Sequence, residues 1–111
     1  MAAMAWSHSQ LRGRIEEVIV DAYGDYEQLG SFACVLDELI HRPVPASVLG
    51  QRVELLSVAE DPELTGGLRA KCRHDGRVRE VALGDVTLAE PADPELDLTV
   101  AAYRRWARGL S

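Results

Sequence analysis

A change in the spacing of apolar residues at Pro43 to Pro45 most constrains the fold of this chain. Before this point apolar residues recur every three to four positions, which is typical of amphipathic helices. After it they alternate with polar residues, which is typical of strands that bury one face. The two prolines force the chain out of helix between these regions. The sequence therefore predicts helices followed by a β-sheet.

Two helices are predicted before the prolines. The first covers 11–22, where the apolar residues form one stripe, and Gly24 follows it as a left-handed C′ residue. The second is expected to run from Asp25, its N-cap, to about Ile40. Gln28 would complete a D-x-x-Q capping box at its start.

The region 48–90 contains short alternating runs separated by turn residues, as in three or four antiparallel strands. Asp75-Gly76 between two such runs is a strong hairpin signal. Asp93-Pro94 then starts a third helix, because Asp is a favoured cap and Pro suits the first helical position. The predicted fold class is therefore α+β, with two N-terminal helices packed on a small antiparallel SH3-like sheet or barrel and a C-terminal helix.

These elements predict a flexible tail over 1–10 and a single domain over 11–111. Within the domain we expect acidic helices over 11–41, a small β-barrel over 48–90 and the C-terminal helix over 93–109. The 111 residues, 47% of them apolar, suffice for one domain with a modest core.

Several functional classes find no support in the sequence. No signal peptide and no stretch long enough for a membrane span is visible, which predicts a cytoplasmic protein without a membrane role. No nucleophile elbow or phosphate loop indicates an enzyme, and the three histidines fit an ordinary surface. Cys34 and Cys72 lack metal-ligand spacing and are expected to be buried, reduced thiols. The sequence does not indicate the oligomeric state.

The net charge of −6 is concentrated in the segment 15–41, which holds seven acidic residues and no Lys or Arg. Such crowded like charges weaken the compact state unless a cation lies among them. Asp21, Asp37 and Glu38 are expected near the C-terminal ends of helices, where the macrodipole disfavours a carboxylate. Carboxylate oxygens are the ligands that Ca²⁺ prefers. The candidate metal ligands are Asp21, Asp25, Glu27, Asp37 and Glu38.

These carboxylates predict weak calcium binding at two places, the turn between the first two helices and the end of the second. Each place offers only two or three carboxylates, so water and backbone oxygens must complete the coordination shell. An EF-hand is excluded, because a loop that starts at Asp25 has Leu36 at its twelfth position, where a bidentate Glu is needed. An acidic surface kept for solubility, and a capping role for Asp25, remain open as alternatives.

Several short strings of this chain resemble the CcbP-type calcium-binding proteins of cyanobacteria and other bacteria, in the same order. The strings are Ile19 to Tyr23 (IVDAY), Glu27-Gln28, Leu36-Asp37-Glu38, Arg79 to Leu88 (REVALGDVTL) and Tyr103 to Trp106 (YRRW). The resemblance implies a CcbP-like domain that binds Ca²⁺ through surface carboxylates, as a buffer or a sensor. It also implies that the five candidate ligands match acidic positions of the family, although arginines stand where the family has later acids.

A basic hairpin supports a rival hypothesis without calcium. Its bases are Arg69, Lys71, Arg73, Arg77 and Arg79. An SH3-like adaptor could bind an acidic protein partner through them, or they could neutralise the acidic helices. Weak binding of nucleic acid is disfavoured, because no aromatic residue lies in the hairpin to stack on bases and the chain is acidic.

Overall fold

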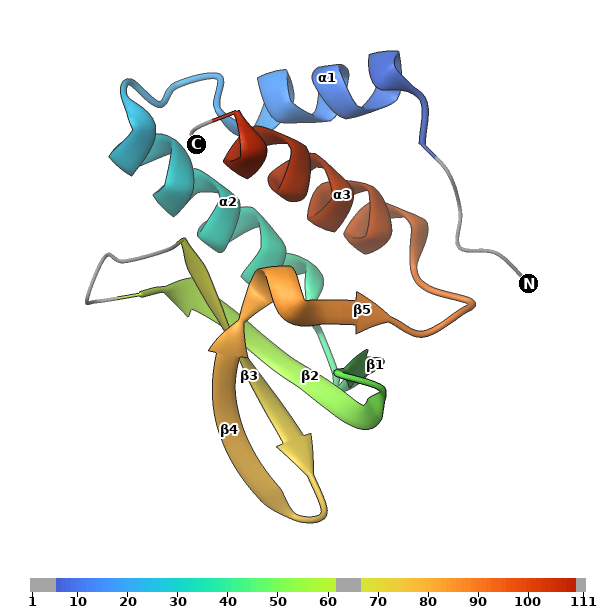
Figure 1. The fold of residues 1–111 in the computed structure, drawn as a ribbon. Coiled ribbons are helices and arrows are strands. Elements are labelled where there is room, and N and C mark those ends of the chain that lie inside the picture. The colour runs from blue at the N-terminus through green and yellow to red at the C-terminus, as the bar shows by residue number, and fades with distance from the viewer. Residues whose placement is uncertain (1–5, 62–66, 110–111) are drawn as a thin grey trace.

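The computed structural model describes residues 6–61 and 67–109, in which three helices lie over one face of a five-stranded antiparallel sheet (Figure 1). The helices are α1 (His8–Val18), α2 (Asp25–Leu39) and α3 (Pro94–Arg108). The strands are β1 (Val44–Val48), β2 (Gln51–Glu60), β3 (Leu68–His74), β4 (Arg77–Ala82) and β5 (Val86–Leu88), with the 3₁₀ turn η1 (Leu83–Asp85) before β5. The predicted α+β class is confirmed. The start of the expected tail, 1–5, and the turn at 62–66 lie outside the described residues.

The sheet has the strand order β4-β3-β2-β1-β5, so that β4 and β5 form its two edges. The sequence predicted either a sheet or a closed barrel. The described residues form an open sheet. Its first strand begins at Val44, before the expected start of the β-region at 48. Ala46 pairs with Val53 on one side and with Leu88 on the other, which places β1 between β2 and β5.

Two tight turns join neighbouring strands of the sheet. Asp75 and Gly76 have φ angles of 52° and 77°, as a type I′ hairpin turn requires, which confirms the hairpin predicted there. Leu49 and Gly50 have φ angles of 51° and 81° in the same role between β1 and β2. Leu49 carries no turn signal of its own, and its side chain is 94% exposed.

The first helix begins and ends earlier than its apolar stripe predicts. Ser7 caps it, because the Ser7 hydroxyl accepts from the Gln10 backbone and the Gln10 side chain accepts from Ser7 N. It ends at Val18, where β-branched residues follow one another and lower helix propensity. The prediction that Asp21 lies in the last turn of this helix was therefore wrong, since Asp21 lies beyond it.

The prediction that Asp25 caps the second helix was also wrong. Gly24 is the N-cap, with φ 85° and ψ 160°, a conformation that only glycine adopts readily. Asp25 is the first residue inside α2, where the macrodipole favours a carboxylate. The Gln28 side chain does not complete a capping box but accepts a hydrogen bond from Trp106 Nε1 at 2.8 Å.

The core lies between the sheet and the two helices nearest to it, α2 and α3. Phe32 of α2 is fully buried, and its ring centroid lies 5.7 Å from that of Tyr103 and 5.3 Å from that of Trp106, both on α3. The Tyr103 hydroxyl accepts a hydrogen bond from Leu68 N at 3.0 Å, which joins α3 to the start of β3. Gly67 leaves room for this hydroxyl, because a Cβ at that position would overlap it.

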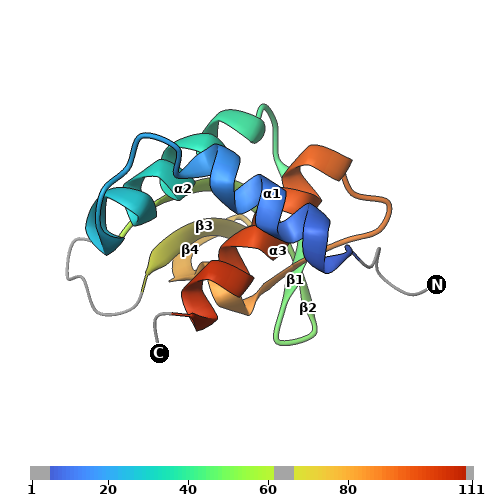
Figure 2. The same ribbon diagram turned by 90° about the horizontal axis from the view of Figure 1, so that it is seen from above.

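The first helix lies on α3, on the side away from the sheet (Figure 2). Arg14 Nη2 pairs with Glu95 at 2.6 Å, and Trp6 Nε1 donates to Asp97 at 2.8 Å. α1 contains no fully buried residue, so it covers the α2–α3 layer without contributing to its centre. Within 6–61 and 67–109, no helix is long and apolar enough to cross a membrane.

We predict that Tyr103→Phe lowers the free energy of unfolding by about 1–2 kcal/mol, because the buried amide of Leu68 loses its acceptor. Urea denaturation monitored by circular dichroism measures the change. Tyr23→Phe is the matched control. Because Tyr23 is 79% exposed, loss of its hydroxyl should leave the free energy of unfolding unchanged. Equal stability of the two variants would contradict the role assigned to this hydrogen bond.

Candidate functional site

The α1–α2 turn, which here denotes residues 19–27 and so includes the first residues of α2, carries three of the five candidate carboxylates. Asp21, Asp25 and Glu27 are all exposed. Glu27 Oε2 accepts a hydrogen bond from Tyr23 N at 3.4 Å, which folds this side chain back over the start of α2. The carboxylates of Asp21 and Asp25 form no hydrogen bond or ion pair with any described residue, so they face solvent freely.

The other two candidates, Asp37 and Glu38, lie in the last turn of α2. Asp37 Oδ1 accepts a hydrogen bond from Val58 N of β2 at 3.1 Å. This amide follows an irregularity in the β2–β3 pairing between Leu55 and Ser57. Asp37 therefore links the C-terminal end of α2 to strand β2 by a hydrogen bond. No signal in the sequence indicated this structural role. Glu38 Oε1 accepts from Cys34 Sγ at 3.6 Å on the exposed side of the helix.

The two groups lie at opposite ends of α2 and cannot share an ion. Twelve residues separate Asp25 from Asp37, which corresponds to about 18 Å along a helix. Within the described part of the chain, no three acidic, histidine or cysteine side chains lie close enough to hold a metal ion. The residues as placed do not fit a preformed metal centre, at either end of α2.

The α1–α2 turn also exposes apolar side chains that the sequence analysis missed. Val20, Tyr23 and Tyr26 are 72%, 79% and 61% exposed. Their only signal in the sequence is that they fall outside the apolar stripes of the two helices. Two exposed aromatic residues thus lie among the acidic residues in the sequence of this turn.

The basic hairpin does not present its five bases on one face. Lys71 is paired with Glu80, and Arg79 is paired with the buried Cys72. Because paired residues lie on the same side of a sheet and neighbours alternate, Lys71 and Arg79 lie on opposite faces. Arg69 and Arg73 lie with Lys71, whereas Arg77 lies with Arg79.

One of these bases is already engaged within the sheet. Arg73 Nε and Nη2 both contact Glu54 Oε1, at 2.8 and 2.7 Å. The single basic surface that the adaptor hypothesis needs is therefore divided between two faces and partly neutralised.

The two thiols have different environments. Cys72 is buried in the core, as expected, and burial raises the pKa of its thiol. Cys34 is exposed on α2, so the prediction that both thiols are buried was wrong. The hydrogen bond to Glu38 and the negative charge of that carboxylate raise the pKa of the Cys34 thiol.

We predict that Glu38→Gln lowers the pKa of Cys34 towards its ordinary value and thus increases its thiolate fraction at a fixed mildly alkaline pH. The rate of modification by a disulfide reagent should rise, and the pH–rate profile should move to lower pH. Glu17→Gln on α1 is the control, because it removes the same charge away from Cys34. It should leave the pH–rate profile of Cys34 unchanged. An unchanged profile in Glu38→Gln would show that this carboxylate does not act on the thiol.

We also predict that Asp37→Ala lowers the free energy of unfolding by about 1–2 kcal/mol, because Val58 N loses its acceptor. Asp37→Asn retains an oxygen acceptor and should recover most of the loss. Glu38→Ala, one residue further along the exposed side of the helix, should have little effect in the same denaturation experiment. A loss as large in Glu38→Ala as in Asp37→Ala would refute the structural role of Asp37.

Comparison with known proteins places the fold. The sequence matches no protein-family model and no curated protein. The crystal structure of Anabaena CcbP aligns with a TM-score of 0.74 and 24% identity, over 98% of both chains. A calcium binding protein in the calcium-binding form aligns with a TM-score of 0.70 and 25% identity, again over 98% of both chains. The chain therefore has a CcbP-like fold, which confirms at the level of fold the resemblance seen in the sequence.

Proposed function

We propose that this chain is a calcium-binding protein of modest affinity. The observation that carries the proposal is the likeness, over 98% of both chains, to a protein described in its calcium-binding form. The crowding of acidic residues in the segment 15–41 supports it independently, because a divalent cation would relieve their repulsion.

The α1–α2 turn is the first place where we expect the ion to bind. Asp21 and Asp25 have no hydrogen-bonded or ionic partner among the described residues, so binding a cation there breaks no existing contact. Glu27 would give up only a long hydrogen bond to Tyr23 N. Asp37 and Glu38 form the second proposed place, but Asp37 must keep or share its bond to Val58 N.

The exposure of these carboxylates sets the expected strength of binding. Ca²⁺ takes 6–8 oxygens, so water and backbone carbonyls must supply most of its ligands where only two or three carboxylates are near. Such water-rich sites bind with a dissociation constant on the order of 10⁻⁴–10⁻³ M. A buffer or a sensor that responds to high calcium would have this affinity.

We predict that Ca²⁺ at ten times its dissociation constant stabilises the fold by about 1.4 kcal/mol and raises the melting temperature by about 5 °C. Isothermal titration calorimetry with Ca²⁺ and with Mg²⁺, together with thermal denaturation, measures binding and stabilisation. The double variant Asp21→Asn/Asp25→Asn should weaken the calcium response and change the stability of the ion-free protein by less than about 1 kcal/mol, since Asp25 loses only its favourable position at the start of α2.

A matched control separates local binding from general screening of charge. Asp85→Asn/Glu90→Gln removes the same two charges from exposed positions far along the chain and should leave the calcium response intact. A heat of binding that falls equally in both double variants would point to non-specific attraction. Absence of heat and of a melting shift at millimolar calcium would refute the proposed function.

A further inference from the structure

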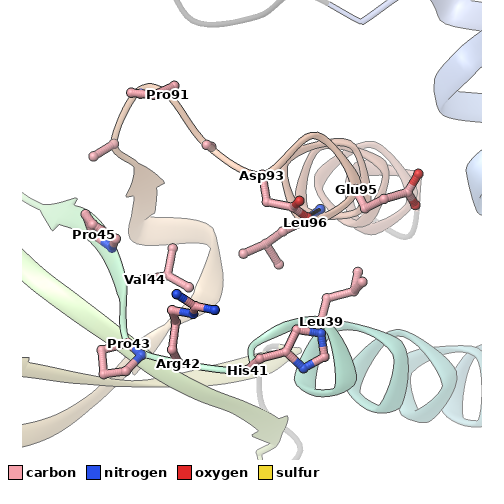
Figure 3. A pocket seen from close by; sticks show the side chains of 12 residues that line it. Leu39, His41, Arg42, Pro43, Val44, Pro45, Pro91, Asp93, Glu95 and Leu96 are labelled. Carbon is pink, nitrogen blue, oxygen red and sulfur yellow. Dashed lines mark hydrogen bonds between the residues drawn. The ribbon is translucent and has the colours of Figure 1, made fainter.

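We propose that a second site, unrelated to calcium, binds a small organic anion with an apolar body. The site is a pocket of about 500 Å³ between the end of α2, the start of β1 and the loop before α3 (Figure 3). This volume lies within the range of pockets that bind small molecules in proteins, about 300–1,000 Å³.

The walls of the pocket are mainly apolar and come from segments far apart in the sequence. They are formed by Leu39, Val44, Pro45, Pro91 and Leu96. The pairing of Ala46 with Leu88 holds β1 beside β5 and so brings these segments together. A short hydrocarbon chain or a small ring would bury its surface against these side chains.

Arg42 is the one Lys or Arg among the described residues that line the pocket, and it is exposed to solvent. The Arg42 side chain lines the pocket, and its guanidinium lies beside Val44 and points into the space below Leu96 (Figure 3). It forms no hydrogen bond or ion pair with the residues that the structure describes. A guanidinium matches a carboxylate or a sulfonate with two parallel hydrogen bonds, which makes Arg42 the natural anchor for an anionic head group.

The two acidic residues of the pocket bond to groups other than Arg42. Asp93 is the N-cap of α3 and accepts a hydrogen bond from Leu96 N at 3.0 Å. Glu95 forms an ion pair with Arg14 Nη2 at 2.6 Å. Arg42 is therefore the lining residue whose charged hydrogen-bond donors are left for a ligand, so the pocket fits an amphipathic molecule whose head group accepts them, such as a carboxylate.

Hexanoate and hexanamide test the proposal, because they share a hydrocarbon chain and differ in charge. We expect hexanoate, titrated into ¹⁵N-labelled protein with a calcium chelator present, to shift the amide resonances of Val44 and Leu96 at millimolar concentration. Hexanamide should bind about tenfold more weakly, and Arg42→Gln should weaken hexanoate binding by a similar factor. Arg12→Gln, an exposed substitution on α1 away from the pocket, should bind hexanoate like the wild type.

The same spectra show whether each variant is folded, so a loss of binding cannot be mistaken for unfolding. The proposal is overturned if hexanoate shifts no resonance of the pocket, if hexanamide binds equally well, or if Arg42→Gln binds hexanoate as the wild type does. Because the chelator removes calcium throughout, none of these outcomes bears on the calcium proposal.

Discussion

The aromatic contact between α2 and α3 fixes the arrangement on which the rest of the molecule depends. Phe32 is the only phenylalanine of the chain, is completely buried, and packs against the rings of Tyr103 and Trp106, which also contact each other with their centroids 6.2 Å apart. Two hydrogen bonds accompany this packing. Trp106 Nε1 of α3 donates to the Gln28 side chain of α2, and Leu68 N of β3 donates to the Tyr103 hydroxyl of α3. One helix pair thus sets the position of the acidic turn at one end of α2 and of the apolar pocket at the other.

Elements with a strong local signal could be predicted from the sequence. Asp75-Gly76 can form a tight turn with two positive φ angles whatever surrounds it, and the structure has that turn. Asp93 caps α3 as predicted, with Pro94 as the first helical residue. The strand β1 could not be predicted in this way, because Pro43 precedes it, Pro45 lies within it, and it is stabilised by pairing with β2 and β5 on its two sides. One of these partners, β5, is distant in the sequence.

The same distinction applies to the candidate sites. Helix geometry alone separates Asp25 from Asp37, so the division of the carboxylates into two groups could be foreseen. The bond from Val58 N to Asp37 could not, since it depends on how α2 lies on β2. The environment of Arg42 likewise arises only when the residues after α2 meet the loop before α3. The candidate carboxylates could thus be identified from the sequence. The groups that they contact could be identified only from the three-dimensional structure.

The two edge strands of the sheet affect how readily copies of the protein associate through their sheets. An edge strand exposes unpaired backbone groups and can recruit a strand from a neighbouring copy, but charged side chains and short strands oppose this. β4 carries exposed Arg77, Arg79 and Glu80 on the edge of the hairpin, and β5 is only three residues long. Neither edge strand is both long and uncharged, as efficient pairing with a strand of another molecule would require. Arg77 and Arg79, two of the five bases of the hairpin, thus place charge on the edge strand β4, where charge opposes pairing with a strand of another molecule.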